Sequence, residues 1–300
     1  MPSVSEPGRR ARGVALFVLA LGVGVAGCER VVRVTAPTSE PRLVVEARLE
    51  RSIGRATGNQ RIRLSTTEDV FSTGAAPPVR GATVRVSDST GTVTLFVESV
   101  TEPGVYLASA MRLRTGWPYT LHVTWQGDSY RATERMLAGV PIDSLYVTEG
   151  SRFPGAPSGP RATINFRDPG NTKNWYLWDQ WLDGVRQISN DSASFTRFAI
   201  PDELLNGSEV REFQPFGGIT VRVGQLVAVR QISIPEQLYR YYAILSSQTQ
   251  NNGSPFGVPA TNLRGNIENS TTPSRRPLGY FFVAEYSERA IRWTGGFLGQ

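Results

Sequence analysis

Apolar and polar residues alternate along much of the chain after residue 42, in short segments separated by turn residues. The segment 43–50 shows the pattern most clearly, with apolar residues at every second position and charged residues at 46, 48 and 50. A period of two predicts a strand with one buried face and one solvent-facing face. Further segments of this kind are 60–64, 82–86, 93–97, 104–107, 119–125 and 129–133.

Turn residues between these segments indicate how the strands fold together. Examples are Asp88–Gly91, Glu102–Gly104 and Gln126–Asp128, which are rich in Asp, Gly or Pro. About seven short strands, with turns at intervals of roughly 8–12 residues, predict a β-sandwich of the immunoglobulin or transthyretin kind. We assign this domain to residues 42–138. The paired cysteines of antibody domains are missing, so only the general architecture is implied.

A second β-rich domain is predicted for residues 139–293, which leaves residues 294–300 as a tail. The segment Gly139–Ser144 marks the boundary, and the Gly- and Pro-rich residues 150–160 are expected to form a loop. Asp183–Gly184 lies between two apolar runs and is typical of a hairpin turn. The strands predicted in this domain are 161–166, 175–182, 185–189, 220–223, 226–229 and 279–283.

One amphipathic helix is predicted near residues 234–251. Ser233 is placed to cap its first turn and Glu236 to reach back, while Pro235 lacks only a donor that the first turn does not need. The helix is followed by a long loop, 251–277. Its apolar residues fall on one stripe, which we expect to bury against the second-domain sheet: Leu238, Tyr241, Tyr242 and Leu245.

The first 27 residues have a pattern of their own. A basic start precedes the apolar, glycine-rich stretch 13–27, which is shorter than the ~20 residues that a transmembrane helix needs. A basic start, a short apolar run and small residues at the cleavage site are typical of a secretory signal. We therefore expect residues 1–27 to be a signal peptide.

Cys28 follows the small residues directly, and it is the only cysteine in the chain. This arrangement resembles the bacterial lipoprotein box, in which the thiol carries two fatty acyl chains such as palmitate and the peptide is cut before it. Lipidation of Cys28 is thus predicted, with residues 28–41 as an acylated N-terminus and tether. Ordinary secretion, with an unmodified cysteine, is the alternative.

Composition and charge narrow the function classes. The hydrophobic content of 40% and the charged content of 19% are ordinary for a globular protein. The formal net charge is +6, but the arginines are scattered and form no basic cluster. Nucleic-acid binding requires such a cluster or a recognised module, so we expect no nucleic-acid partner.

Catalytic residues do not stand out. His122 is the only histidine. It can be interpreted either as a general base or as an ordinary surface histidine. Without a second histidine or a free cysteine, a zinc site is not expected, and no Gly-x-Ser-x-Gly elbow is present. We expect no enzyme activity, no cofactor and no metal. The alternative is a glycan hydrolase with two carboxylates drawn from Asp179, Asp183, Asp191, Asp202, Glu203 and Glu212.

The aromatic segment 175–181 is the strongest candidate for binding. Alternation places Trp175 and Trp181 on one face of a strand, and Tyr176 and Trp178 on the other. One interpretation is that one face exposes aromatic rings to a glycan, a peptide or a protein partner. The other is that both faces are buried, one under the helix and one between domains.

Short motifs recur in an order that resembles a known family. They include Pro41–Glu46, Pro77–Ala82 and Phe166–Pro169, and after the helix Gly265–Asn266 and Leu278–Phe281. Together with the lipoprotein box, this order resembles the lipoprotein family named domain of unknown function 4249, over residues 28–293. The resemblance implies an outer-membrane lipoprotein of diderm bacteria, often encoded beside a TonB-dependent receptor. It implies no catalytic residues.

The expected function is therefore that of a non-enzymatic, lipid-anchored envelope protein. As an accessory of a TonB-dependent receptor, it would help to capture or take up a ligand. Two alternatives remain, a surface glycan hydrolase and a structural envelope protein without a small ligand. The sequence leaves open whether the protein faces the periplasm or the cell surface.

Overall fold

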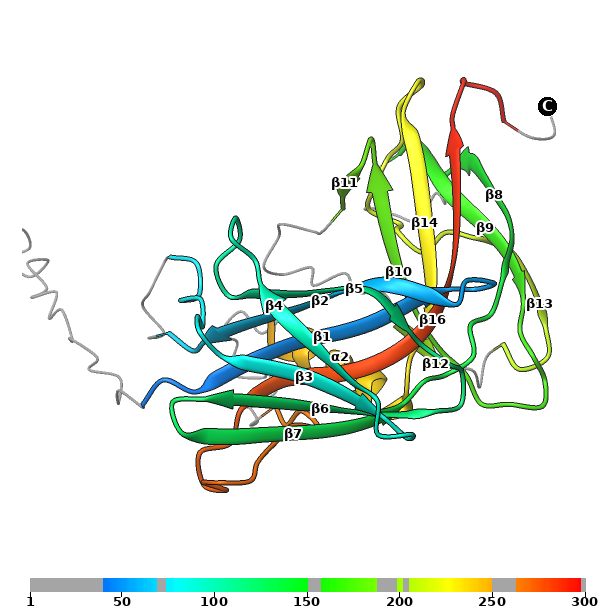
Figure 1. The fold of residues 1–300 in the computed structure, drawn as a ribbon. Coiled ribbons are helices and arrows are strands. Elements are labelled where there is room, and N and C mark those ends of the chain that lie inside the picture. The colour runs from blue at the N-terminus through cyan, green and yellow to red at the C-terminus, as the bar shows by residue number, and fades with distance from the viewer. Residues whose placement is uncertain are drawn as a thin grey trace, which may run out of the picture. The chain divides into compact units, whose positions relative to one another are not determined.

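The alternating segments form strands in the computed structural model, which describes residues 40–68, 74–150, 158–187, 199–201, 205–249 and 263–297 (Figure 1). The predicted mainly-β fold class is confirmed. The described residues contain one helix, α2 (Glu236–Thr249). The strands are β1 (Leu43–Ser52), β2 (Thr57–Thr66), β3 (Thr83–Asp88), β4 (Val93–Glu98), β5 (Val105–Arg112), β6 (Pro118–Trp125), β7 (Asp128–Arg135), β8 (Ile142–Glu149), β9 (Pro160–Arg167), β10 (Trp175–Leu182), β11 (Val185–Arg186), β12 (Ala199–Pro201), β13 (Glu209–Phe213), β14 (Leu226–Ser233), β15 (Glu268–Asn269) and β16 (Leu278–Arg292).

Most of these strands belong to one long hydrogen-bonded sheet. Its order is β11-β10-β14-β16-β1-β2-β5-β4-β3-β6-β7-β15, and β12 pairs with β10 beside this path. The sheet folds over near β4, which pairs with β5 on one side and β3 on the other. The two layers enclose the first core. Strands β13, β9 and β8 form a separate small sheet.

Strand β1 illustrates why the first core forms. Leu43, Val45, Ala47 and Leu49 are buried in it, as the period-two pattern predicts. Apolar residues of β3 and β6 face them across the sandwich, and those of the neighbouring strand β2 lie beside them. Burial of each of the Val and Leu side chains contributes about 1.5–3 kcal/mol. The other face of β1 is left for polar residues.

Strand β16 joins the two predicted domains. Its first part pairs in parallel with β1, from Leu278 opposite Val44 to Tyr286 opposite Ser52. Its later part pairs with β14 in antiparallel fashion (Figure 1). A second core lies among β8, β9, β10 and β14. The boundary predicted at residue 139 stays a prediction. Strands from both sides of it share one sheet.

Close backbone contacts hold the start of β16 in place. A Cβ atom added to Gly279, which has φ +93°, would overlap the carbonyl oxygen of Val45 on β1. The adjacent Gly265 is equally confined by the carbonyl of Gly279. Asn266 accepts a hydrogen bond from the amide of Phe281 (2.9 Å) and donates to its carbonyl (2.7 Å). The Asn266 side chain thus acts as a neighbouring strand would.

The predicted helix is confirmed, but its cap is not. Leu238 and Tyr242 are buried against β10, β14 and β16, and Tyr241 and Leu245 pack beside them. Ser233 is the last residue of β14 instead, and its buried hydroxyl makes no hydrogen bond with a described residue. The helix begins where the Pro235 carbonyl accepts the amides of the two residues Leu238 and Tyr239.

One predicted strand is absent. Residues 220–223 do not form one, because a single bond from the Val221 amide to Pro160 leads into a turn at Gly224, where φ is +89°. Strand β8 begins inside the segment predicted as a boundary. The small strands β12, β13 and β15 were not predicted.

Residues 1–39, 151–157 and 251–262 lie outside the described residues, and with them the signal peptide, Cys28 and most of the tether.

Candidate functional site

The polar face of β1 forms the floor of a cleft. Glu46, Arg48 and Glu50 alternate with the buried residues of this strand and therefore point away from the core. Strand β16 flanks them on one side, with Tyr280 opposite Glu46 and Phe282 opposite Arg48. Strand β2 flanks them on the other. Two adjoining hollows open on this face, and we call them together the β1 cleft.

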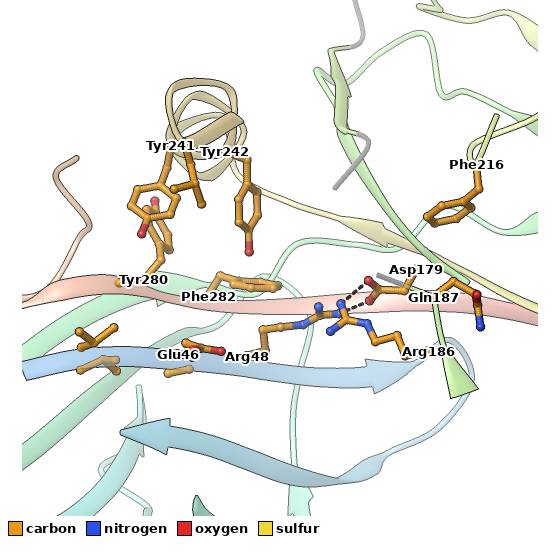
Figure 2. Close-up of a pocket in the computed structure, with 15 residues that line it drawn as sticks. Glu46, Arg48, Asp179, Arg186, Gln187, Phe216, Tyr241, Tyr242, Tyr280 and Phe282 are labelled. Atoms are coloured by element: carbon orange, nitrogen blue, oxygen red, sulfur yellow. Dashed lines mark hydrogen bonds and ion pairs between the residues drawn. The ribbon is translucent and has the colours of Figure 1, made fainter. Parts of the chain in front are cut away.

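The first hollow is mostly apolar and has a volume of about 390 Å³. Tyr241 and Tyr242 point down from α2 toward β16, as Figure 2 shows. The ring centres of Tyr241 and Tyr280 lie 5.5 Å apart. Pockets of ~300–1,000 Å³ with aromatic walls are typical of small-molecule sites. The side chains that form its apolar wall include Leu245, Phe216, Tyr280 and Phe282.

The second hollow is polar and has a volume of about 690 Å³. It continues from the first along β1 and β2, and the two share Glu46, Arg48, Asp179 and Arg186. Its lining contains six arginines but only three carboxylates. The arginines are Arg48, Arg55, Arg61, Arg63, Arg186 and Arg230.

Asp179 on β10 holds the junction between the two hollows. Its carboxylate accepts hydrogen bonds from Arg48 (2.7 Å) and from Arg186, and only 5% of the side chain is exposed (Figure 2). Burial alone would raise the pKa of Asp179, but the two guanidinium groups hold the pKa well below its usual range. Asp179 is therefore an ionised, immobilised carboxylate.

The ion pairs extend into a ladder across the sheet. Arg48 also binds Glu50, and Glu50 binds Arg230 at 3.0 Å. Arg230 reaches Glu288 at 2.7 Å, and its guanidinium lies 3.9 Å from the ring centre of Tyr286. Burial would lower the pKa of Arg230, but Glu50 and its other neighbours keep that pKa above the ordinary value. We call this row the charge ladder, and its members are Arg186, Asp179, Arg48, Glu50, Arg230 and Glu288.

Acid should weaken the folded state through Asp179. Because its folded pKa lies below the unfolded value of about 3.9, its contribution is complete above that pH and is lost as the pH falls toward the folded pKa. Urea unfolding at pH 7, 4 and 3 should show a smaller loss of stability in Asp179→Asn than in the wild type. The matched control is Asp143→Asn, an exposed aspartate on β8, which should keep the wild-type profile. Equal profiles for wild type and Asp179→Asn would contradict the assignment.

The four aromatic residues proposed as contacts lie in different surroundings in the structure. Tyr176 and Trp178 are buried in the second core, and the Trp178 indole donates to Gln231 at 3.0 Å. These two were wrongly proposed as surface contacts, because their face of β10 packs into the second core. Trp175 is half-buried and packs near the helix. Trp181 is also half-buried and lines the polar hollow, so it alone of the four lies in the β1 cleft.

The carboxylates proposed for hydrolysis have other roles where the structure describes them. Asp179 is fixed between two arginines, and an acid with a lowered pKa is not suited to donate a proton at neutral pH. Asp183 lies in the exposed hairpin turn and accepts the amide of Leu226 at 2.9 Å. Glu212 is exposed on β13. The other three, Asp191, Asp202 and Glu203, lie outside the described residues.

His122 lies far along the sheet on β6, between Arg85 and Arg131 in the register. Burial and these two positive neighbours lower its pKa, so the imidazole is neutral at pH 7. Its ring nitrogen lies 3.5 Å from the Ser87 hydroxyl. Within the described ranges, no group of three or more His, Cys, Asp or Glu side chains is arranged to hold a metal ion.

Sequence reasoning missed the main residues of the β1 cleft. Arg48, Arg186 and Arg230 come from three different strands, and only their contacts show that they belong together. A signal was present in β1 itself, where charged residues alternate on a strand that proves to be central in its sheet. Charges at such a position require partners, which points to a buried network.

A family model described as Domain of unknown function (DUF4249) matches residues 29–290. Among solved structures, the crystal structure of a DUF4785 family protein from Legionella pneumophila matches with 14% sequence identity and a TM-score of 0.21. That match covers 64% of this chain and 52% of the other, so this chain spans about half of it. A search of curated proteins found no match.

Proposed function

We propose that this chain, which belongs to the family described as Domain of unknown function (DUF4249), is a non-enzymatic, lipid-anchored protein of the bacterial envelope. It would serve a TonB-dependent receptor of the outer membrane in capturing or taking up a ligand. The observation that carries the proposal is the single cysteine, Cys28, which directly follows a basic and then apolar leader. The family match begins at residue 29, immediately after that cysteine. This supports a mature chain that starts at Cys28.

Acylation of Cys28 would anchor the chain without help from the folded part. Each buried methylene adds ~0.8 kcal/mol of membrane affinity, and two acyl chains together anchor stably where one does not. The residues up to 41 would then act as a tether, with Pro37 and Pro41 opposing regular structure. No helix in the part of the chain that the structure describes has the length and apolarity to cross a membrane.

The β1 cleft supports a role in ligand capture. It combines an aromatic hollow with fixed charges, as small-molecule sites commonly do. A ligand held there would be kept close to any receptor in the same membrane, which raises its local concentration without new contacts. The receptor as partner is inferred from the family resemblance alone.

Mass spectrometry of the mature protein tests the anchor. We expect the mature N-terminus to be Cys28 with diacylglycerol on its sulfur, and the protein to sediment with membranes. The Cys28→Ser variant should lose the lipid mass and the membrane association. Recovery of wild-type protein with a bare or missing Cys28 would overturn the proposed anchoring.

Affinity capture tests the partner. The native protein, purified in mild detergent from its own cells, should bring down a TonB-dependent receptor barrel, and Cys28→Ser should recover less of it. Repeated capture without any receptor would contradict the accessory role and favour a structural envelope protein. Protease treatment of intact cells would separately distinguish surface from periplasmic location.

A further inference from the structure

We propose that the β1 cleft binds a small amphipathic anion, with an aliphatic or aromatic body in the apolar hollow and a carboxylate-like head in the polar hollow. This inference rests on the proposed role in ligand capture and names the ligand class. It follows from three observations, namely the division of the cleft, its excess of donors and its rigidity.

The cleft is divided into an apolar hollow and a polar hollow, with one layer of side chains between them. The apolar hollow lies between the stripe of α2 and the aromatic residues of β16, with Tyr241, Leu245 and Phe282 in its wall. The polar hollow begins at Arg48 and Arg186, which border both hollows. A ligand that fills both must therefore be apolar at one end and polar at the other.

The residues that line the polar hollow determine the sign of the charge expected on the polar end of the ligand. Arginine supplies five N–H donors and no acceptor, and the polar hollow contains six arginines. Asp179 and Glu50 are already engaged in the charge ladder. Arg55 and Arg63 are exposed, and neither forms an ion pair with a described residue. The unused donors favour a head group that accepts hydrogen bonds and carries negative charge.

Glu46 is the one lining acid outside the ladder, and it lies opposite Arg63 in the register of β1 and β2. It reduces the positive field but does not remove it, since Arg55 lies in the turn between β1 and β2 and forms no ion pair with a described residue. The ladder itself keeps Arg48 and Arg186 in place, because each is held by Asp179. Donors that are already ordered lose little entropy when a ligand binds.

Three ligands with the same ten-carbon chain test the proposal: decanoate, 1-decanol and decyltrimethylammonium. We expect thermal shift and calorimetry, below the micelle concentration, to show binding of decanoate to the mature protein made without acyl chains as Cys28→Ser. Decanol should bind at least about tenfold more weakly, and the cation should not bind. Raising the salt concentration should weaken decanoate binding, because the head lies in the open polar hollow.

Matched variants locate the site. Arg63→Gln should weaken decanoate binding about fivefold, whereas Arg85→Gln, an exposed arginine outside the cleft, should not. Leu245→Ala should weaken the binding of decanoate and decanol alike. Ile244→Ala is its control, because Ile244 is the neighbouring helix residue, is 43% exposed and does not line the cleft.

The outcomes are distinct. Equal binding of decanoate and decanol, preferential binding of the cation, or binding that Arg63→Gln and Leu245→Ala leave unchanged would each overturn the proposal. So would binding of no member of the series. A receptor recovered by affinity capture in that case would leave the proposed function standing, since that experiment does not depend on the ligand class.

Discussion

Replacing Gly279 by alanine is expected to lower the free energy of unfolding by at least about 4 kcal/mol, or to prevent folding. A methyl group at this position would overlap the carbonyl oxygen of Val45, which belongs to the backbone of the adjacent strand β1. Relief requires the two strands to separate where their parallel pairing begins. The positive φ of +93° adds a further cost of ~1–2 kcal/mol for a residue with a Cβ atom.

Gly91→Ala is the matched control. Gly91 also has a positive φ, +84°, but a Cβ atom there would meet no other atom within 4 Å. It should therefore cost only about 1–2 kcal/mol, the conformational part of the effect. Urea unfolding followed by circular dichroism measures both variants. Equal, small losses for the two would show that the β1–β16 contact is not as close as described.

Replacing Arg48 by alanine is expected to cost about 3 kcal/mol of stability. Arg48 connects Asp179 to Glu50, and only 22% of its side chain is exposed. Removal leaves two carboxylates short of a partner, and breaking a buried pair in this way costs about 3–5 kcal/mol. We take the lower end because a part of the guanidinium reaches solvent.

Arg61→Ala controls for the loss of an arginine. Arg61 is the direct cross-strand neighbour of Arg48, but its side chain is 52% exposed and pairs with the exposed Glu102. That change should cost less than about 1 kcal/mol. A cycle that combines Arg48→Ala with Asp179→Ala should show strongly non-additive losses. Similar values for Arg48→Ala and Arg61→Ala would mean that the ladder contributes little.

The sequence predicted those elements whose pattern is local. In β1 and β6, alternation of buried and exposed residues follows directly from the sheet geometry, and the predicted limits lie within a few residues of the observed ones. The helix stripe of Leu238 and Tyr242 was equally readable, because one face of α2 meets the sheet. These patterns do not depend on which strand becomes the neighbour of which.

What the sequence did not reveal depends on such neighbours. Nothing in β1 indicates a parallel partner more than two hundred residues later, and only that pairing puts Phe282 beside Arg48. The aromatic strand β10 misled for the same reason. Its two faces look alike until one is seen to meet the second core and the other to meet α2, so the burial of Trp178 was not evident.

The cleft could be predicted least of all. Its charged residues lie on β1, β2, β10, β11 and β14 and in the turn after β1, and each taken alone is an ordinary arginine, aspartate or glutamate. Cross-strand proximity makes them a network. Trp181 was identified from its aromatic surroundings, but its position at the edge of the polar hollow follows from the pairing of β10 with β14.

The pairing of β1 with β16 sets an order of events for a chain made from its N-terminus. One long edge of β1 has no partner until residues 278–286 have emerged, although β2 can pair with the other edge at once. Contacts so distant in sequence form late, because closing a long loop costs entropy before any contact repays it. A product that stops before residue 278 would keep that edge open and would be prone to join other chains through it.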